Sequence, residues 1–155
     1  MKHPNKQQWI SVVMTAVSKT ILLTKQLNTT WEFLNDFERV GKCLPGCQEV
    51  KVLGEDKSYW KVKVTLGIIS RILETEVTRS ADADKKQISF HIRSKTGDLE
   101  GNLKASLVPE NDKTKLDLNF DVKAIGSFSW VINQMVGRQS DKMAEQFVSC
   151  VEASI

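Results

Sequence analysis

Apolar residues occupy every second position over four separate stretches from residue 60 onward. In residues 60–66, for example, the apolar side chains alternate with Lys61, Lys63 and Thr65. Successive side chains of a β-strand point to opposite faces, so this spacing predicts strands with one dry face and one wet face. Such strands are typical of an antiparallel sheet that is covered on one side only. The residues predicted for the dry face are Trp60, Val62, Val64, Leu66, Ile88, Phe90, Ile92, Leu99, Leu103, Ala105, Leu107, Leu116, Leu118, Phe120, Val122 and Ala124.

Short polar segments separate these stretches, and their lengths are those of hairpin connections. They lie at residues 55–57, 82–85, 96–98 and 110–113. Residues 68–79 differ, because apolar side chains occur there in both registers. A bulge or bend after Gly67 would account for that change. The sequence therefore predicts a run of about six antiparallel strands, and six to seven in the whole sheet.

Two short helices are predicted before this run of strands. Residues 28–30 are Asn-Thr-Thr, whose side chains cap helix starts, and they precede a helical pattern at 31–34. Residues 35–36 are Asn-Asp and offer a second start for a helix over 37–44. Both helices would follow a first strand formed by the N-terminal part of the chain.

One long helix is predicted over residues 128–153, which contain no proline. Gly137 should weaken or kink it, because glycine is a poor helix former. A curved sheet with one apolar face needs a cover, and this helix is the only predicted element long enough to supply it. The fold class is therefore α+β, with the helix closing over the sheet. Its predicted inner stripe consists of Ile132, Met135, Val136, Met143 and Phe147.

The composition indicates one globular domain. The chain has 155 residues, of which 41% are hydrophobic and 26% are charged, enough for a single substantial core. We interpret residues 1–17 as an N-terminal extension leading into the first strand, and residues 18–155 as the domain. The start of the chain matches a secretory signal peptide only faintly, and no apolar stretch approaches the roughly 20 residues of a membrane-spanning helix. The net charge of +3 is interleaved along the chain, so nucleic acid is not an expected partner.

Three cysteines, Cys43, Cys47 and Cys150, form no repeated framework, and their odd number argues against a disulfide-stapled secreted fold. A reducing cytoplasm is therefore the default location. A structural zinc needs four ligands, and the remaining candidates, His3 and His91, are scattered. No metal site is expected.

The motif formed by Cys43 and Cys47 also differs from redox motifs, because three residues rather than two separate the thiols. We expect both cysteines to act as small, half-buried apolar residues. Pro45 and Gly46 between them would make the turn from the second short helix into a strand at 48–53.

Three segments resemble the CoxG family of carbon monoxide dehydrogenase subunits, within the START/Bet v 1-like superfamily. They are NTTWEFLNDFERVGKCLPGCQEV at 28–50, VKVTLGIISRILETEV at 62–77 and DVKAIGSFSWVINQMVGRQSDKMAEQF at 121–147. The resemblance implies a helix-grip fold and an accessory factor linked to molybdenum-containing hydroxylases. It also implies peripheral association with the inner face of a membrane, an oxidoreductase partner, and an apolar ligand such as a lipid or quinone.

Catalysis requires titratable groups inside a pocket, and strand parity places His91 on the wet face instead. Four ionisable residues have an ambiguous register: Arg71, Glu74, Glu76 and Arg79. A solvated charge ladder between neighbouring strands is a simpler interpretation of these four than a catalytic pair. The sequence contains no serine elbow, phosphate loop or zinc-protease motif, and we assign no catalytic residue and no cofactor.

A cavity between the sheet and the final helix would be lined by apolar residues from both. We expect a non-enzymatic domain that binds an apolar small molecule there. Two alternatives stay open: a cyclase or hydrolase of the polyketide cyclase-like type, and a structural interaction module whose core is filled. Ordinary core packing is a competing interpretation for every lining residue. The candidate ligand-binding residues are Trp60, Val62, Val64, Phe90, Ile92, Leu103, Leu118, Phe120, Trp130, Met135, Met143 and Phe147.

Overall fold

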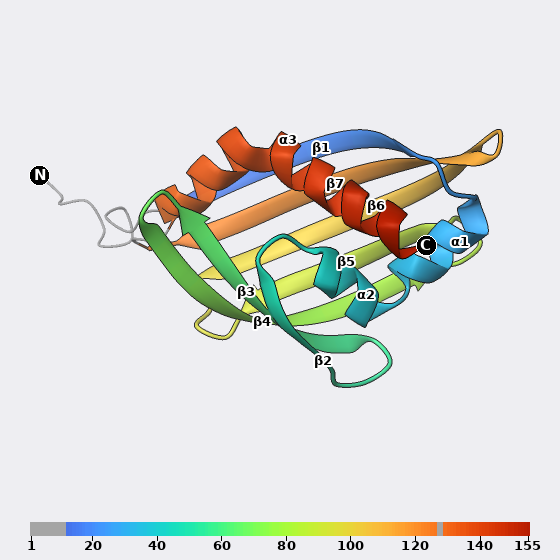
Figure 1. The fold of residues 1–155 in the computed structure, drawn as a ribbon. Helices are drawn as coiled ribbons and strands as arrows, with labels where there is room; N and C mark the ends of the chain where they lie inside the picture. The colour runs from blue at the N-terminus through green and yellow to red at the C-terminus, as the bar shows by residue number, and fades with distance from the viewer. Residues whose placement is uncertain (1–11, 127–128) are drawn as a thin grey trace, which may run out of the picture.

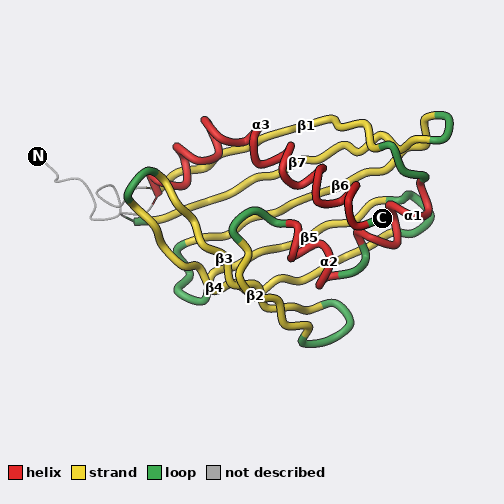
Figure 2. The backbone as a smooth tube through the Cα atoms, in the orientation of Figure 1, coloured by secondary structure: helices red, strands yellow, loops and turns green. Residues whose placement is uncertain are grey.

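The computed structural model describes residues 12–126 and 129–155. Seven antiparallel strands form one sheet in the order β1-β7-β6-β5-β4-β3-β2, which confirms the predicted α+β architecture (Figures 1 and 2). Each strand alternates its side chains between an inner, largely apolar face and an outer face. The strands are β1 (Val12–Leu23), β2 (Cys47–Val52), β3 (Lys57–Leu66), β4 (Ile69–Asp82), β5 (Gln87–Ser94), β6 (Leu99–Glu110) and β7 (Lys113–Ile125).

The first and last strands of the chain lie side by side. β1 pairs with β7 from Val12 opposite Ile125 to Leu23 opposite Thr114. The predicted boundary between an extension at 1–17 and a domain at 18–155 therefore falls inside β1, and residues 1–11 lie outside the described residues. Pairing with β7 makes residues 12–17 part of the sheet.

A long helix, α3 (Ser129–Ser154), runs along the inner face of the sheet (Figure 1). It is one helix that continues through Gly137. The predicted first residue of this helix, Phe128, lies outside the described residues, as does the side chain of Val136. Near its start, Val131 and Ile132 pack against an apolar cluster from β3, β4, β6 and β7.

Two short helices, α1 (Leu27–Leu34) and α2 (Phe37–Cys43), cover another part of the inner face. As predicted, Asp36 caps α2, and its side chain accepts hydrogen bonds from the backbone N–H groups of Glu38 and Arg39. The predicted cap of α1 is wrong. That helix begins four residues earlier than expected, after Gln26 and without a side-chain cap, because Leu27 already packs against the core.

The segment with apolar residues in both registers begins in the turn of a hairpin and continues as its second strand, β4. Gly67, with φ +60°, and Ile68 form the turn between β3 and β4, and Leu66 pairs with Ile69. Ile68 and Ile72 are exposed, with relative accessibilities of 103% and 48%. Exposed isoleucines therefore explain the mixed pattern, and the bend expected after Gly67 is a chain reversal.

Candidate ligand-binding cavity

A cavity of about 260 Å³ lies between the inner face of the sheet and α3. Its wall comes from strands β1, β3, β4, β5, β6 and β7, from the end of α2, and from the middle of α3. Nearly all of these side chains are apolar, because alternation along each strand directs the apolar set to this face. The polar residues in the wall are Lys19, Lys63, Thr75 and Ser140.

The structure brings ten of the twelve candidate binding residues together around this cavity. The strand residues among them share the inner-face parity that the alternation predicts. The α3 residues lie one to two turns apart and face the sheet. The ten are Trp60, Val62, Val64, Ile92, Leu103, Leu118, Phe120, Met135, Met143 and Phe147.

Phe90 and Trp130 lie elsewhere. Phe90 is 1% exposed and packs against the rings of Phe37 and Trp60, with centroids 5.9 and 6.0 Å away. The covering α2 helix fills that part of the inner face, so Phe90 belongs to the closed core. Trp130 is 50% exposed. Adjacent helical positions differ by about 100°, and here Val131 and Ile132 are the residues that face inward.

Several wall residues were not among the candidates. Val17 and Lys19 come from β1, which lies partly in the segment interpreted as an extension. Val40 lies in α2 and Leu44 and Pro45 follow it, a predicted helix and turn to which no part of the cavity was assigned. Apolar residues of β1 occur in both registers, so alternation does not identify the first pair, and the contribution of α2 depends on tertiary packing. The remaining wall residues not proposed are Leu73, Thr75, Leu99, Val122, Ile132, Ser140 and Ala144, together with Lys63.

An open groove of about 400 Å³ shares Pro45, Lys63, Met135 and Met143 with the cavity wall, and we call this groove the mouth. Residues 45–48 form one rim, α3 forms the other with Met135, Gln139, Met143 and Gln146, and β3 contributes Lys63 and Thr65. Gly46 has φ +84°, and a Cβ there would lie 2.2 Å from the Lys63 carbonyl oxygen. Only glycine fits at this point of the rim, which supports the turn predicted at Pro45 and Gly46.

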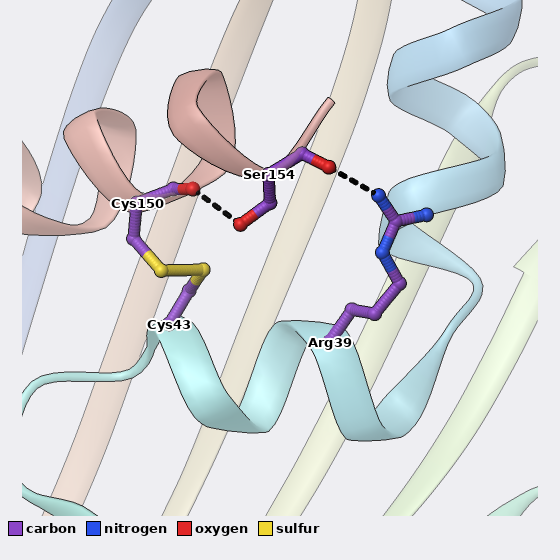
Figure 3. The surroundings of a disulfide bond; sticks show 4 residues. All are labelled: Arg39, Cys43, Cys150 and Ser154. Atoms are coloured by element: carbon purple, nitrogen blue, oxygen red, sulfur yellow. Dashed lines mark hydrogen bonds between the residues drawn. A yellow bond between two sulfur atoms is a disulfide. The ribbon is translucent and has the colours of Figure 1, made fainter.

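A disulfide joins α2 to α3. The Sγ atoms of Cys43 and Cys150 are 2.05 Å apart (Figure 3). Beside it, Arg39 Nη2 donates to the Ser154 carbonyl oxygen over 2.8 Å. The prediction that Cys43 acts as a half-buried apolar residue is therefore wrong, because α2 and the end of α3 meet in space. The expected reducing location rested on the odd number of cysteines, and this disulfide removes that argument.

Cys47 carries a free thiol and is half-buried, as predicted. Its Sγ lies 3.5 Å from the Glu49 carbonyl oxygen. Burial raises the pKa of this thiol, so the neutral form is favoured. Within the residues that the structure describes, no group of three His, Cys, Asp or Glu side chains is placed to hold a metal.

The four ionisable residues of ambiguous register fall into two pairs. Glu74 and Glu76 lie on the outer face and contact Tyr59 and Lys57 of β3 at 2.7 and 3.0 Å. This pair matches the expected charge ladder.

Arg71 and Arg79 instead have inner-face parity at the two ends of β4. Arg71 Nη2 lies 2.5 Å from Asp98 Oδ2, and Arg79 Nη2 lies 3.4 Å from Asp56 Oδ1. Neither arginine is among the cavity-lining residues. His91 lies on the outer face, 42% exposed, with Nε2 3.4 Å from Glu100 Oε1.

The sheet, the covering helix and the cavity between them define a helix-grip protein of the START/Bet v 1-like type. Solved structures agree. A conserved protein from Geobacillus kaustophilus is 17% identical, with a TM-score of 0.74, and the match covers 90% of this chain and 94% of that one. A START superfamily protein from Mycobacterium smegmatis is 19% identical, with a TM-score of 0.67, and the match covers 90% of this chain and 99% of that one. The ZhuI aromatase/cyclase from Streptomyces sp. R1128 is 15% identical, with a TM-score of 0.69, and the match covers 90% of this chain and 94% of that one.

The CoxG family of carbon monoxide dehydrogenase subunits matches residues 21–155. The chain therefore belongs to that family, as the three sequence segments indicated. No curated protein matches the sequence. Among the described helices, none combines the length and the apolar character needed to cross a lipid bilayer.

Proposed function

We propose that this protein binds an apolar small molecule, lipid- or quinone-like, in the cavity under α3. The observation that carries the proposal is the wall itself, which surrounds a void of about 260 Å³ with almost purely apolar side chains. An apolar void that stays unfilled costs stability, whereas an apolar ligand would make up the missing contacts. The void is slightly below the usual range of about 300–1,000 Å³ for ligand pockets, so a longer ligand would extend into the mouth.

The family supports a second part of the proposal, an accessory role for a molybdenum hydroxylase of the carbon monoxide dehydrogenase type. In this role the oxidoreductase is the partner, and the protein associates peripherally with the membrane from which an apolar ligand would come.

Catalysis of the polyketide cyclase-like type is a weaker candidate. Acid–base chemistry requires an acid and a base that reach the substrate. Among the described cavity-lining residues, the ionisable side chains are two lysines, and His91 lies on the opposite face of the sheet. The fold is shared with an aromatase/cyclase, but the described residues that line this cavity do not supply an acid–base pair.

Filling the cavity tests the proposal. The neutral probe N-phenyl-1-naphthylamine should bind the wild type, and Met143→Trp should weaken that binding because the indole would occupy the void. Glu145→Trp is the matched control, since Glu145 lies exposed on the same helix. Mass spectrometry of organic extracts of the purified protein would identify a retained ligand. If the wild type binds no probe and yields no ligand, the interaction module with a filled core is the better interpretation.

A further inference from the structure

A charged side chain of β1, that of Lys19, lies on the inner face of the sheet and lines the cavity. Lys19 shares its face of β1 with Val17 and Ile21, and its backbone partner on β7 is Leu118, itself a wall residue. The neighbouring Ser18 and Thr20 are exposed on the opposite face. Alternation therefore directs the Lys19 side chain toward the cavity, at a position where an apolar residue would satisfy the pattern.

The ammonium group of Lys19 reaches the seam between β1 and α3, where it forms an ion pair with Asp141. The Lys19 side chain is 30% exposed and that of Asp141 is 82% exposed. An ion pair with so exposed a partner contributes little to stability. Another anion can therefore displace the Asp141 carboxylate from Lys19 at a small cost in free energy, and Lys19 would be paired both before and after the exchange.

The charges of the wall have a single sign. Among the described residues that line the cavity, the charged ones are Lys19 and Lys63, and none carries a carboxylate. Lys63 has the outer-face parity of β3 and is exposed, so Lys19 is the charged residue of inner-face parity. The hydroxyl of Thr75 already donates to the Trp60 carbonyl oxygen over 2.8 Å. Ser140, which directly precedes Asp141 in the sequence, adds a further polar group to the cavity wall. Such a wall favours an anionic group and disfavours a cationic one.

We infer that the ligand is an amphiphile with a carboxylate headgroup, which Lys19 binds at the seam while the apolar tail fills the cavity. This inference rests on the proposed binding function and specifies the headgroup. A carboxylate suits the site better than a phosphate, because one ammonium group would leave half of the charge of a phosphate dianion uncompensated. The charge-assisted hydrogen bond from Lys19 would replace the one that Asp141 now accepts.

The test compares dodecanoic acid with 1-dodecanol, which has the same chain length and no charge. Each would compete with N-phenyl-1-naphthylamine for the wild type and for four variants. The wild type should bind the acid about tenfold more tightly than the alcohol, the effect of one charge-assisted hydrogen bond. Lys19→Met should abolish that preference, Lys19→Arg should retain it, and Asp141→Asn should increase it by removing the competing anion.

Lys104→Met is the matched control, because Lys104 is exposed on the outer face of β6, and it should leave the preference unchanged. Asp141→Asn changes an exposed side chain, so it tests the inference even where a Lys19 variant folds poorly. Equal binding of acid and alcohol by the wild type, or a preference that survives Lys19→Met, would overturn the inference while the binding function stands. Failure of the wild type to bind probe, acid or alcohol would overturn both.

Discussion

Cys43 and Cys150 join the last residue of α2 to the last two turns of α3, across a sequence separation of 107 residues. The rim of the mouth at residues 45–48 follows Cys43 almost directly in the sequence, so the disulfide lies next to one end of this rim. Close by, the Thr24 backbone N–H donates to Glu152 Oε1 over 3.0 Å. The C-terminal end of α3 is therefore attached to both α2 and the end of β1.

Removing the disulfide should destabilise the protein. A cross-link between residues far apart in sequence lowers the conformational entropy of the unfolded chain, and the resulting stabilisation is largest when the closed loop is long. We expect Cys43→Ser combined with Cys150→Ser to lower the free energy of unfolding by about 2–5 kcal/mol in denaturant titrations. Cys47→Ser, which leaves the disulfide intact, is the control. Thiol counting should find one free thiol before reduction, and three would contradict the assignment.

Tyr59 provides a second prediction, because it is the only tyrosine in the chain. Its hydroxyl donates to Glu74 Oε1, and this bond raises the pKa of Tyr59 from 10.0 to about 12. A raised pKa means that the folded state favours the protonated phenol. The resulting stabilisation is complete below pH 10 and is lost as the pH rises toward 12. Ultraviolet absorbance of the phenolate should titrate near 12, and Glu74→Gln should move the midpoint toward 10. Equal midpoints in the two proteins would show that Glu74 does not act on Tyr59.

Strand parity could be predicted from the sequence because it depends on local alternation. Trp60 and Phe90 were both assigned to the inner face, and both lie there. Parity does not say where along that face a cavity lies, however. Trp60 borders the void, while Phe90 packs in a closed core. The difference arises from where α2 covers the sheet, which depends on contacts between segments distant in sequence.

The same limit explains the disulfide. The short spacing between Cys43 and Cys47 drew attention to that pair, although the partner of Cys43 is Cys150. Nothing local relates α2 to the end of α3, and only the closed fold brings their cysteines together. Lys19 was missed for a related reason, since apolar residues of β1 occur in both registers and part of that strand was assigned to an extension.

The rim of the mouth provides a third prediction. Replacing Gly46 by Ala would require a left-handed backbone conformation and would place the new Cβ against the Lys63 carbonyl. We expect Gly46→Ala to lower the free energy of unfolding by at least about 2 kcal/mol. Gly54→Ala is the control, because its Cβ would meet nothing within 4 Å, and it should change stability by less than about 0.5 kcal/mol. Similar losses in both variants would mean that the rim does not need glycine.

The middle of α3 provides the last prediction. This helix is fixed near its start by Val131 and Ile132 and near its end by Cys150, while the part between covers the cavity and its mouth. Gly137 lies in that middle part, and a Cβ added there would meet nothing within 4 Å. Gly137→Ala should therefore raise the free energy of unfolding by about 1 kcal/mol, the difference in helix propensity.

If ligands enter by flexing α3 at Gly137, the same substitution should also slow the exchange of N-phenyl-1-naphthylamine. Its equilibrium affinity should change little, because the wall of the cavity is unaltered. Stopped-flow fluorescence would measure both association and release. Ser149→Ala is the matched control, since Ser149 is exposed on α3 beyond the cavity, and it should leave both rates unchanged. A more stable Gly137→Ala protein with wild-type exchange rates would show that ligands enter without bending this helix.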